Sequence, residues 1–274
     1  MKGYYPNKRW YKIMEEEKNE VIETMLNHKT IRNYKEKVPS DKKIKKIVRA
    51  GQQAPFVSQM YSVLLTKKGN IPFDAPLLFT ICVDIHKLEK VMEKRNWDLV
   101  TNDLSLLLFG IQDASLMAEN MVIAGESEGL GSCFLGMAPY YADKIIEEYD
   151  LPEKVFPVVQ LVMGYPEKDK ETRPRYPMDF VLFEDEYPEL DNEKIDKAMK
   201  KMDEGYLAQD YYKNLNAKIP IKKDKNDEFT YENYSWTEHI SRKWGQWYEK
   251  PDKIIEQLKK CGFDLSCNSH QGRH

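Results

Sequence analysis

The segment between Leu104 and Gly125 constrains the fold more than any other part of the sequence. Its larger apolar residues recur with the spacing of one helical face: Leu104, Leu107, Leu108, Ile111, Met121 and Val122. Asn102 or Asp103 precedes them as a capping residue, and small residues, mainly alanine, form a second apolar face. So wide an apolar surface is buried on more than one side. The pattern therefore predicts a helix that crosses the centre of a domain or is covered by a second subunit.

Shorter apolar segments on both sides of this helix predict an α+β domain. Those typical of strands are rich in Val, Ile, Leu and Phe and are bounded by Gly, Pro or Asp: Tyr61–Thr66, Pro76–Asp84, Gly131–Leu135 and Val155–Met163. Those typical of helices have helical spacing or capping residues: Asn19–Leu26, Ser40–Gly51, Asp143–Tyr149, Trp236–Trp247 and Pro251–Cys261. We expect a central, mostly antiparallel β-sheet flanked by helices.

Changes of composition along the chain predict its organisation. Residues 1–17 are polar and aromatic without a clear period, and we expect an N-terminal extension there. The core domain is expected over 18–190. A helical excursion and C-terminal helices, packing on the core or on a partner subunit, are expected over 191–265. Charged residues and Tyr dominate 191–232, which predicts helices but no second core, and 266–274 is expected to be a tail.

The charge balance and the length of the apolar stretches exclude several classes of protein. Lys and Arg total 42 against 45 Asp and Glu, a net charge of -3, whereas a nucleic-acid-binding protein needs a basic face. The most apolar stretches, Leu104–Ile111 and Val155–Val162, are far shorter than the roughly 18 residues that span a bilayer. The N-terminus carries no apolar stretch like that of a signal peptide. We expect a soluble, cytoplasmic protein with no nucleic-acid or membrane partner.

Several familiar patterns of cofactor and metal binding are missing or out of place. The glycine-rich stretch from Gly125 to Gly131 follows a helix instead of opening one, which argues against a Rossmann dinucleotide site. Cys82 and Cys133 lie in strand patterns, which indicates core residues. Near the chain end, in an expected mobile tail where we predict no metal site, stand residues of zinc-ligand type: Cys261, Cys267, His270 and His274.

Two basic segments at the ends of apolar elements are the candidates for ligand binding. His28–Arg32, with the sequence His-Lys-Thr-Ile-Arg, places two cations, an imidazole and a hydroxyl in one connection after a helix. Arg173–Arg175, with the sequence Arg-Pro-Arg, holds two guanidinium groups apart after a buried strand. Arginine's planar fork matches phosphate oxygens. A phosphate attached to an electron-accepting ring would use these groups well, and a solvated surface segment is the alternative for each.

The order of several segments along the chain resembles the nitroreductase family of flavin enzymes. The resemblance covers about Val21–Leu265, is most specific over Gly110–Pro177, and is closest to the larger NADPH-dependent, oxygen-insensitive nitroreductases and FMN reductases. The segments that carry it are, in order, His28–Arg32, Ala54-Pro55, Ser58-Gln59, Gly110–Gly131, Phe134–Gly136, Met163–Pro166, Arg173–Pro177 and Trp236–Ile240.

The resemblance implies a homodimer that binds FMN between its subunits, with the long central helices at the dimer interface. His28, Lys29 and Thr30 would lie near the FMN phosphate or ribityl chain, and Arg173 and Arg175 would complete the phosphate site. The other cofactor-binding residues implied in this way are Ser58, Gln59, Phe134, Leu135 and Gly136.

By the same resemblance, the protein takes hydride from NADPH or NADH and passes electrons to a small acceptor by a ping-pong route. The acceptors would be nitroaromatics, quinones or free flavin. Arg32 would face the N1/C2=O edge of the flavin and stabilise the reduced form, because reduction places negative charge at that edge. No further catalytic residue is expected, since the flavin itself performs the redox chemistry.

Departures from the family pattern leave the electron donor and the substrate open. The segment over 66–76 replaces a longer helix and loop that normally reaches the flavin, and Met137-Ala138-Pro139 stands where a second glycine and a basic residue are usual. Asn70 and Lys250 remain as candidates for substrate binding. The alternatives are a related flavoenzyme with another electron donor or substrate, and a non-catalytic flavin-binding dimer.

Overall fold

The computed structural model describes residues 19–222, 226–247 and 249–265 of the 274-residue chain. The chain divides into a first unit, whose described residues are 19–170 and 251–265, and a second unit over 171–250. The expected N-terminal extension and C-terminal tail lie outside the described residues. The expected boundary between a core and an excursion at residues 190 and 191 stays a prediction.

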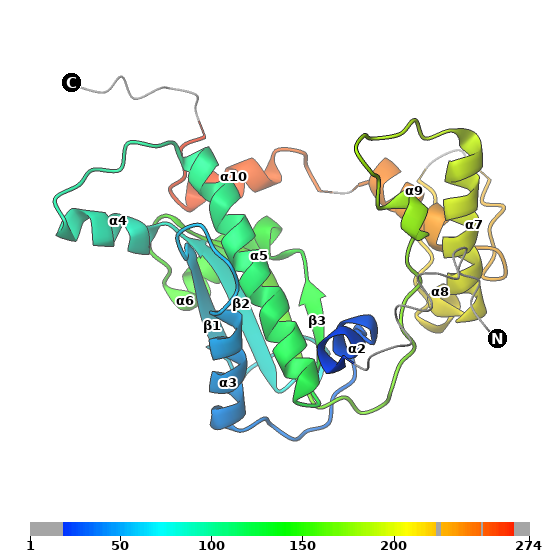
Figure 1. The fold of residues 1–274 in the computed structure, drawn as a ribbon, viewed down its shortest axis with the longest axis horizontal. Coiled ribbons are helices and arrows are strands. Elements are labelled where there is room, and N and C mark those ends of the chain that lie inside the picture. Colours follow the sequence, from blue (N-terminus) through cyan, green and yellow to red (C-terminus); the bar gives the residue numbers. More distant parts are fainter. Residues whose placement is uncertain (1–18, 223–225, 248, 266–274) are drawn as a thin grey trace. The chain divides into compact units, whose positions relative to one another are not determined.

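A four-stranded sheet forms the centre of the first unit (Figure 1). Every neighbouring pair of strands is antiparallel, and β2 pairs with β4 from Leu77 opposite Met163 to Asp84 opposite Val155. All eight residues of β2 are buried, so both faces of the sheet are covered along this strand. The expected α+β class with an antiparallel sheet is therefore confirmed. In spatial order the strands are β1 (Tyr61–Thr66), β2 (Leu77–Asp84), β4 (Val155–Gly164) and β3 (Gly131–Leu135).

Helices α3 (Asp41–Gly51) and α5 (Asp103–Ser127) lie on one face of this sheet (Figure 1). Because successive strand residues point to opposite faces, Leu77, Phe79 and Ile81 of β2 reach the same core cluster as α3 and α5. The predicted caps are present: Ser40 accepts a hydrogen bond from Lys43 N at 3.3 Å, and Asn102 accepts one from Ser105 N at 2.8 Å.

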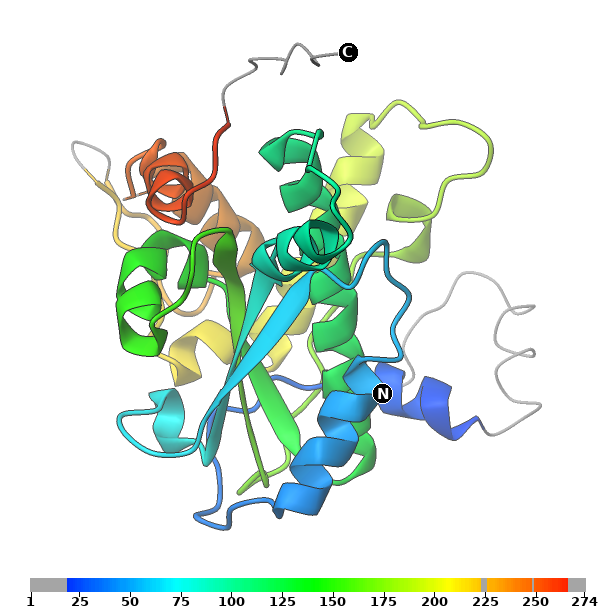
Figure 2. The same ribbon diagram turned by 90° about the vertical axis from the view of Figure 1, so that its left-hand side faces the viewer.

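The opposite side of the sheet carries α6 (Ala142–Tyr149), as Figure 2 shows. The short 3-10 helix η2 (Ala138–Tyr141) packs on β4 next to it, and α10 (Lys253–Lys260) packs on both. Cys261, expected near a mobile end, is instead buried in a cluster with Ala142 and Phe156. The difference arises because the C-terminal helix returns to the first unit and its end is covered there.

Helix α5 is long and apolar enough, by length and composition alone, to cross a membrane. Half of its most apolar window is buried inside the protein, and the core helix of a soluble protein passes the same test. Its contacts with β2 and α3 account for the apolar sequence as core packing.

Helix α2 (Glu20–Leu26) is capped by Asn19, the first residue of the predicted helix, whose side chain accepts hydrogen bonds from Val21 N and Ile22 N. Helix α4 (His86–Lys94) is absent from the sequence-based expectation. It has no buried residue, and Ile85, which precedes it, supplies no capping side chain. Its signals were nevertheless present in the sequence, since Asp84 Oδ1 accepts a hydrogen bond from Lys87 N at 3.0 Å at the start of the helix and Leu88 packs against a core cluster.

The second unit contains α7 (Asn192–Ala208), α8 (Tyr211–Asn214) and α9 (Trp236–Gly245). The expectation that this region has no core is wrong, since a cluster of one methionine and three tyrosines is buried there: Met202, Tyr206, Tyr212 and Tyr234. A tyrosine buries a large ring once its hydroxyl has a partner, and a count of aliphatic residues misses that contribution.

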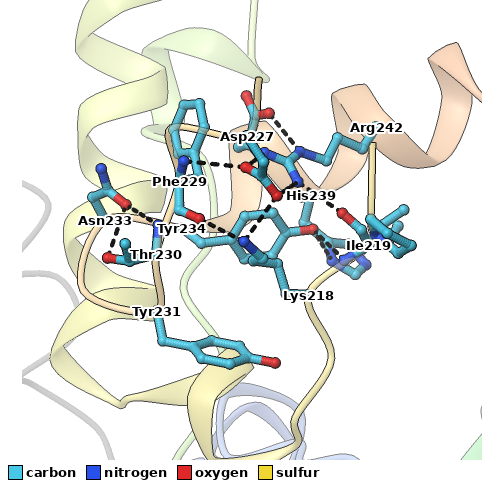
Figure 3. Close-up of polar contacts among 12 residues, drawn as sticks. Lys218, Ile219, Asp227, Phe229, Thr230, Tyr231, Asn233, Tyr234, His239 and Arg242 are labelled. Atoms are coloured by element: carbon cyan, nitrogen blue, oxygen red, sulfur yellow. Dashed lines mark hydrogen bonds and ion pairs between the residues drawn. The ribbon is translucent and has the colours of Figure 1, made fainter. Parts of the chain in front are cut away.

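A polar network ties the loop before α9 to that helix (Figure 3). The buried Arg242 donates hydrogen bonds to both carboxylate oxygens of Asp227, at 2.7 and 3.0 Å, and to Ile219 O at 2.8 Å. The Arg242 guanidinium, helped by Lys218, holds the pKa of the Asp227 carboxyl well below its usual range. Tyr234 Oη accepts a hydrogen bond from Ile219 N at 3.0 Å, which closes the network on the tyrosine cluster.

Candidate functional site

The basic segment His28–Arg32 lies along strand β3. Thr30 forms a parallel bridge with Ser132, and Ile31 N donates a hydrogen bond to Ser132 O at 2.8 Å. A Cβ atom at Gly131 would lie only 2.4 Å from Ile31 Cγ1, so this close approach requires glycine at that position. The fold therefore fixes the backbone of the basic segment against a core strand that follows it by a hundred residues of sequence.

The first two residues of this segment, His28 and Lys29, already have carboxylate partners. His28 Nδ1 lies 2.7 Å from Glu126 Oε1 at the C-terminal end of α5. Lys29 Nζ lies 2.7 Å from Asp169 Oδ1, and the Asp169 side chain is almost fully exposed. Exposed ion pairs of this kind contribute little net stability, so a phosphate could replace Asp169 at Lys29 at small cost.

Arg32 is half-buried between β3 and the loop that joins β1 to β2. Its guanidinium lies 5.9 Å from the ring centroid of Phe73 in that loop. Burial raises the pKa of the Cys133 thiol, and the neighbouring Arg32 opposes that rise. Cys133 and Cys82 are both buried, which confirms the expectation that they are core residues.

The turn that carries Ser58 and Gln59 is held by a residue that the sequence did not single out. The carboxylate of Asp113, 1% exposed on α5, accepts backbone hydrogen bonds from Val57 N, Ser58 N and Met60 N at 2.6, 3.1 and 3.0 Å. Gln59 adopts a left-handed backbone, with φ 54°, inside this turn. An aspartate on an otherwise apolar face of the predicted helix was the sequence signal that could have revealed the role of Asp113.

The end of β3 presents Phe134, Leu135 and Gly136 in order. Phe134 is 38% exposed, and the space around the Gly136 Cα is open. Leu135 also lines a cavity of about 320 Å³ that brings it together with Asn70. Other residues lining this cavity are Lys68, Met137, Tyr141, Lys144 and Gln160.

The remaining predicted site residues belong to the second unit. Arg173 stacks on the Tyr211 ring, with its guanidinium carbon 4.0 Å from the centroid, and it donates a hydrogen bond to Gln209. Arg175 is exposed, and its Nη1 donates to the carbonyl oxygens of Arg173 and Pro174 at 3.1 and 3.2 Å. Lys250 is exposed at the end of this unit.

Ser132 adds a polar group that the sequence analysis missed. It is 2% exposed, and its hydroxyl has no hydrogen-bond partner among the residues that the structure describes. Buried hydroxyls nearly always have a partner. Because Ser132 pairs with Thr30, a ligand bound along the basic segment could supply that partner.

In the described ranges, no group of three or more His, Cys, Asp or Glu side chains is arranged to hold a metal ion. Cys267, His270 and His274, three of the four residues considered as zinc ligands, lie outside those ranges. The absence of a metal site therefore stays a prediction.

Comparison with known proteins supports the family suggested by these residues. The family model described as the nitroreductase family matches residues 64–165. The chain is 31% identical over 217 residues to a CR(VI) reductase of Pseudomonas sp. (strain G-1), a match that spans 73% of this chain and 87% of that protein. The chain belongs to the nitroreductase family. The family predicted from the sequence is therefore confirmed.

Other relatives of this nitroreductase-family chain match over nearly its whole length. An FMN reductase [NAD(P)H] of Bacillus subtilis (strain 168) is 26% identical over 264 residues, which cover 90% of this chain and 99% of that protein. The solved structure of B. megaterium NfrA2 superposes with a TM-score of 0.77 at 26% identity, covering 91% of this chain and 100% of that one. The nitroreductase-like fold is thereby confirmed.

Proposed function

We propose that this protein is an FMN-dependent NAD(P)H oxidoreductase that reduces nitroaromatics, quinones or free flavin by a ping-pong route. Membership of the nitroreductase family and relatives named as FMN reductases support the flavin chemistry. The observation that carries the proposal is the basic segment His28–Arg32 fixed along β3 beside the buried Ser132 hydroxyl. We place the enzyme in the cytoplasm, where NAD(P)H is available.

The residues present fit FMN. The segment His28–Thr30 offers an imidazole, an ammonium and a hydroxyl to a phosphate or ribityl chain, and Ser132 offers a buried hydroxyl in need of a partner. By the family resemblance, Arg173 and Arg175 would supply further guanidinium groups for the phosphate. Ser58, Gln59 and the exposed end of β3 at Phe134–Gly136 would supply polar and apolar contacts for the ring and its side chain.

When bound, FMN supplies the redox chemistry by accepting a hydride from NAD(P)H and returning two electrons to the acceptor. The protein's own contribution is position and charge. Arg32, held beside Cys133 and Phe73, provides a positive charge that favours any negative charge gained next to it. Asp113 fixes the turn of Ser58 and Gln59, which orients these groups before a ligand arrives.

We propose further that the enzyme is a homodimer whose interface includes the outer face of α5. In one chain, α5 buries its inner face on the sheet, yet several large apolar residues on its outer face are 43–55% exposed: Leu104, Leu108, Phe109 and Leu116. Helix α2 exposes a second apolar set: Val21, Ile22, Met25 and Leu26. Because α2 and α5 are in contact, exposed apolar side chains on both helices indicate an interaction site.

Anaerobic reduction of the purified protein with NADPH, NADH and dithionite, followed side by side, tests this function. We expect a yellow protein that either nucleotide bleaches, and whose colour returns when a quinone is added. A colourless protein that takes up no added FMN would overturn the proposal. Bleaching by dithionite but by neither nucleotide would instead favour a related flavoenzyme with another electron donor, as the altered 66–76 loop suggests.

A further inference from the structure

The loop between β1 and β2 contains a strained turn. Phe73, inside the 3-10 helix η1 (Pro72–Asp74), has φ 62° and ψ 20°, and the next residue, Asp74, has φ 51°. Side chains larger than glycine rarely adopt this left-handed region, and a bulky aromatic does so only when its surroundings enforce it. Two consecutive residues of this kind in a loop call for a physical reason.

The residues around Phe73 stabilise the turn through burial and backbone hydrogen bonds. Ile71 and Ala75 are buried in the cluster on the face of the sheet away from α5. Asp74 N donates to Ile71 O at 3.2 Å, and Ala75 N donates to Pro72 O at 3.3 Å. Phe73 itself is 42% exposed. Burial of its ring therefore does not explain why an aromatic residue occupies the strained position.

The contact that its ring does make is with Arg32. The guanidinium carbon lies 5.9 Å from the ring centroid, within the range of a cation–π interaction. Arg32 also interacts with the thiol of Cys133, which lies on β3. Arg32 is thus flanked by a core strand and by the aromatic ring of the loop between β1 and β2.

We propose that Phe73 is a positioning residue for Arg32, and that the strained turn is retained because it aims the ring at this guanidinium. The inference rests on the proposed function and on the role beside the flavin ring that the family resemblance implies for Arg32. A long arginine side chain has many rotamers, and a charge stabilises a reaction best when its position is fixed beforehand.

The test compares Phe73→Leu, which keeps apolar bulk without a π face, with Phe73→Tyr, which keeps the ring. Measurements on the FMN-loaded protein are the midpoint potential of the flavin, the rate constant of its reduction by NADPH, and the FMN dissociation constant. We expect Phe73→Leu to lower the potential and to slow reduction about threefold to tenfold, with FMN affinity within about twofold. Phe73→Tyr restores both values, and Trp97→Leu, at an exposed aromatic after α4, leaves them unchanged.

A third variant separates positioning from structural support. Phe73→Gly removes the strain as well as the ring, so it is expected to raise the melting temperature while still lowering the flavin potential. A merely structural Phe73 would move stability and leave the potential unchanged. An unchanged potential and reduction rate in Phe73→Leu would overturn the inference while the proposed function stands.

If the wild-type protein binds no FMN, the proposed function fails, and a double-mutant cycle still decides the contact. Phe73→Leu, Arg32→Met and the double variant are compared by thermal unfolding of the full chain without cofactor. Non-additive effects support the interaction of ring and guanidinium. Additive effects overturn it.

Discussion

Arg32 and Arg175 carry the same guanidinium group in different surroundings. Arg32 is half-buried beside Phe73 and Cys133, whereas Arg175 is exposed and donates to carbonyl oxygens of its own segment. A phosphate is charged in both oxidation states of a flavin, but the ring gains negative charge only on reduction. A cation near the phosphate therefore sets affinity, and one near the ring sets the balance between the two states.

We predict that Arg32→Ala damages flavin reduction more than FMN retention, and that Arg175→Ala does the opposite. Loss of a charge-assisted contact of about 1.5–3 kcal/mol should change the affected quantity roughly tenfold or more. FMN titration of each variant and dye-referenced measurement of its potential check this. An Arg32→Ala protein with the wild-type potential would remove Arg32 from the site.

Gly131 is the residue that lets the basic segment approach β3. An added Cβ would lie 2.4 Å from Ile31 Cγ1 and 2.9 Å from Ile31 Cβ, and Ile31 is buried. We predict that Gly131→Ala destabilises the protein by about 1–3 kcal/mol through overpacking, and weakens FMN binding because Thr30 moves away from Ser132. Urea unfolding and FMN titration measure the two effects.

Gly136→Ala is the matched control for stability, because nothing lies within 4 Å of the Cβ that it would add. Its free energy of unfolding is expected to stay within about 0.5 kcal/mol of wild type. Equal destabilisation by the two alanine substitutions would contradict the packing argument at Gly131.

At the scale of elements, α9 holds the second unit together through side chains on one of its faces. His239 stacks on Tyr212 with ring centroids 4.4 Å apart, and its Nδ1 lies 3.0 Å from Tyr234 Oη. Burial, together with the nearby charge of Lys243, lowers the pKa of His239. The folded state therefore resists protonation of this imidazole more than the unfolded chain does.

The lowered pKa of His239 predicts how the free energy of unfolding depends on pH. Between the unfolded pKa near 6.5 and the lower folded value, the unfolded state binds more protons, so stability is complete above about pH 7 and falls as the pH drops. The slope for one proton is at most about 1.4 kcal/mol per pH unit. Melting curves from pH 7.5 to 5 should show a steeper decline for wild type than for His239→Gln. Parallel curves would exclude His239 as the titrating group.

At the scale of the whole molecule, the outer face of α5 and the exposed face of α2 leave large apolar side chains in water in a single chain. Inward-facing residues of α5 pack on the sheet, so the helix has two apolar faces and only one is covered within its own unit. A second copy that covers the other face would bring two α5 helices into one interface.

We predict that Leu116→Glu on α5 converts the protein from a dimer to a monomer, because a buried unpaired carboxylate is strongly unfavourable in an interface. FMN retention should fall with it if the flavin lies between subunits. Sedimentation velocity and the flavin-to-protein ratio measure the two effects. Val91→Glu on α4, at another exposed apolar residue, is the control and should remain dimeric. A wild-type monomer in solution that retains FMN would refute this assembly.

Local sequence determined most of the secondary structure, because the signals that set it act within a few residues. The limits of β1 and β3, the Ser40 and Asn102 caps, and the long helix α5 were all predictable. Alternating or helical spacing and a capping hydroxyl or amide depend only on neighbours along the chain. The order of several segments along the chain, which resembles that of the nitroreductase family, also indicated the fold and the basic segment of the site.

Only the tertiary structure decided how the site is assembled, because its parts come from distant segments. The bridge of Thr30 to Ser132, the anchoring of Ser58 by Asp113 and the contact of Phe73 with Arg32 each join residues about 40–100 positions apart. The tyrosine core of the second unit was missed for the same reason. Whether a tyrosine ring is buried depends on its neighbours in space, which the sequence does not show.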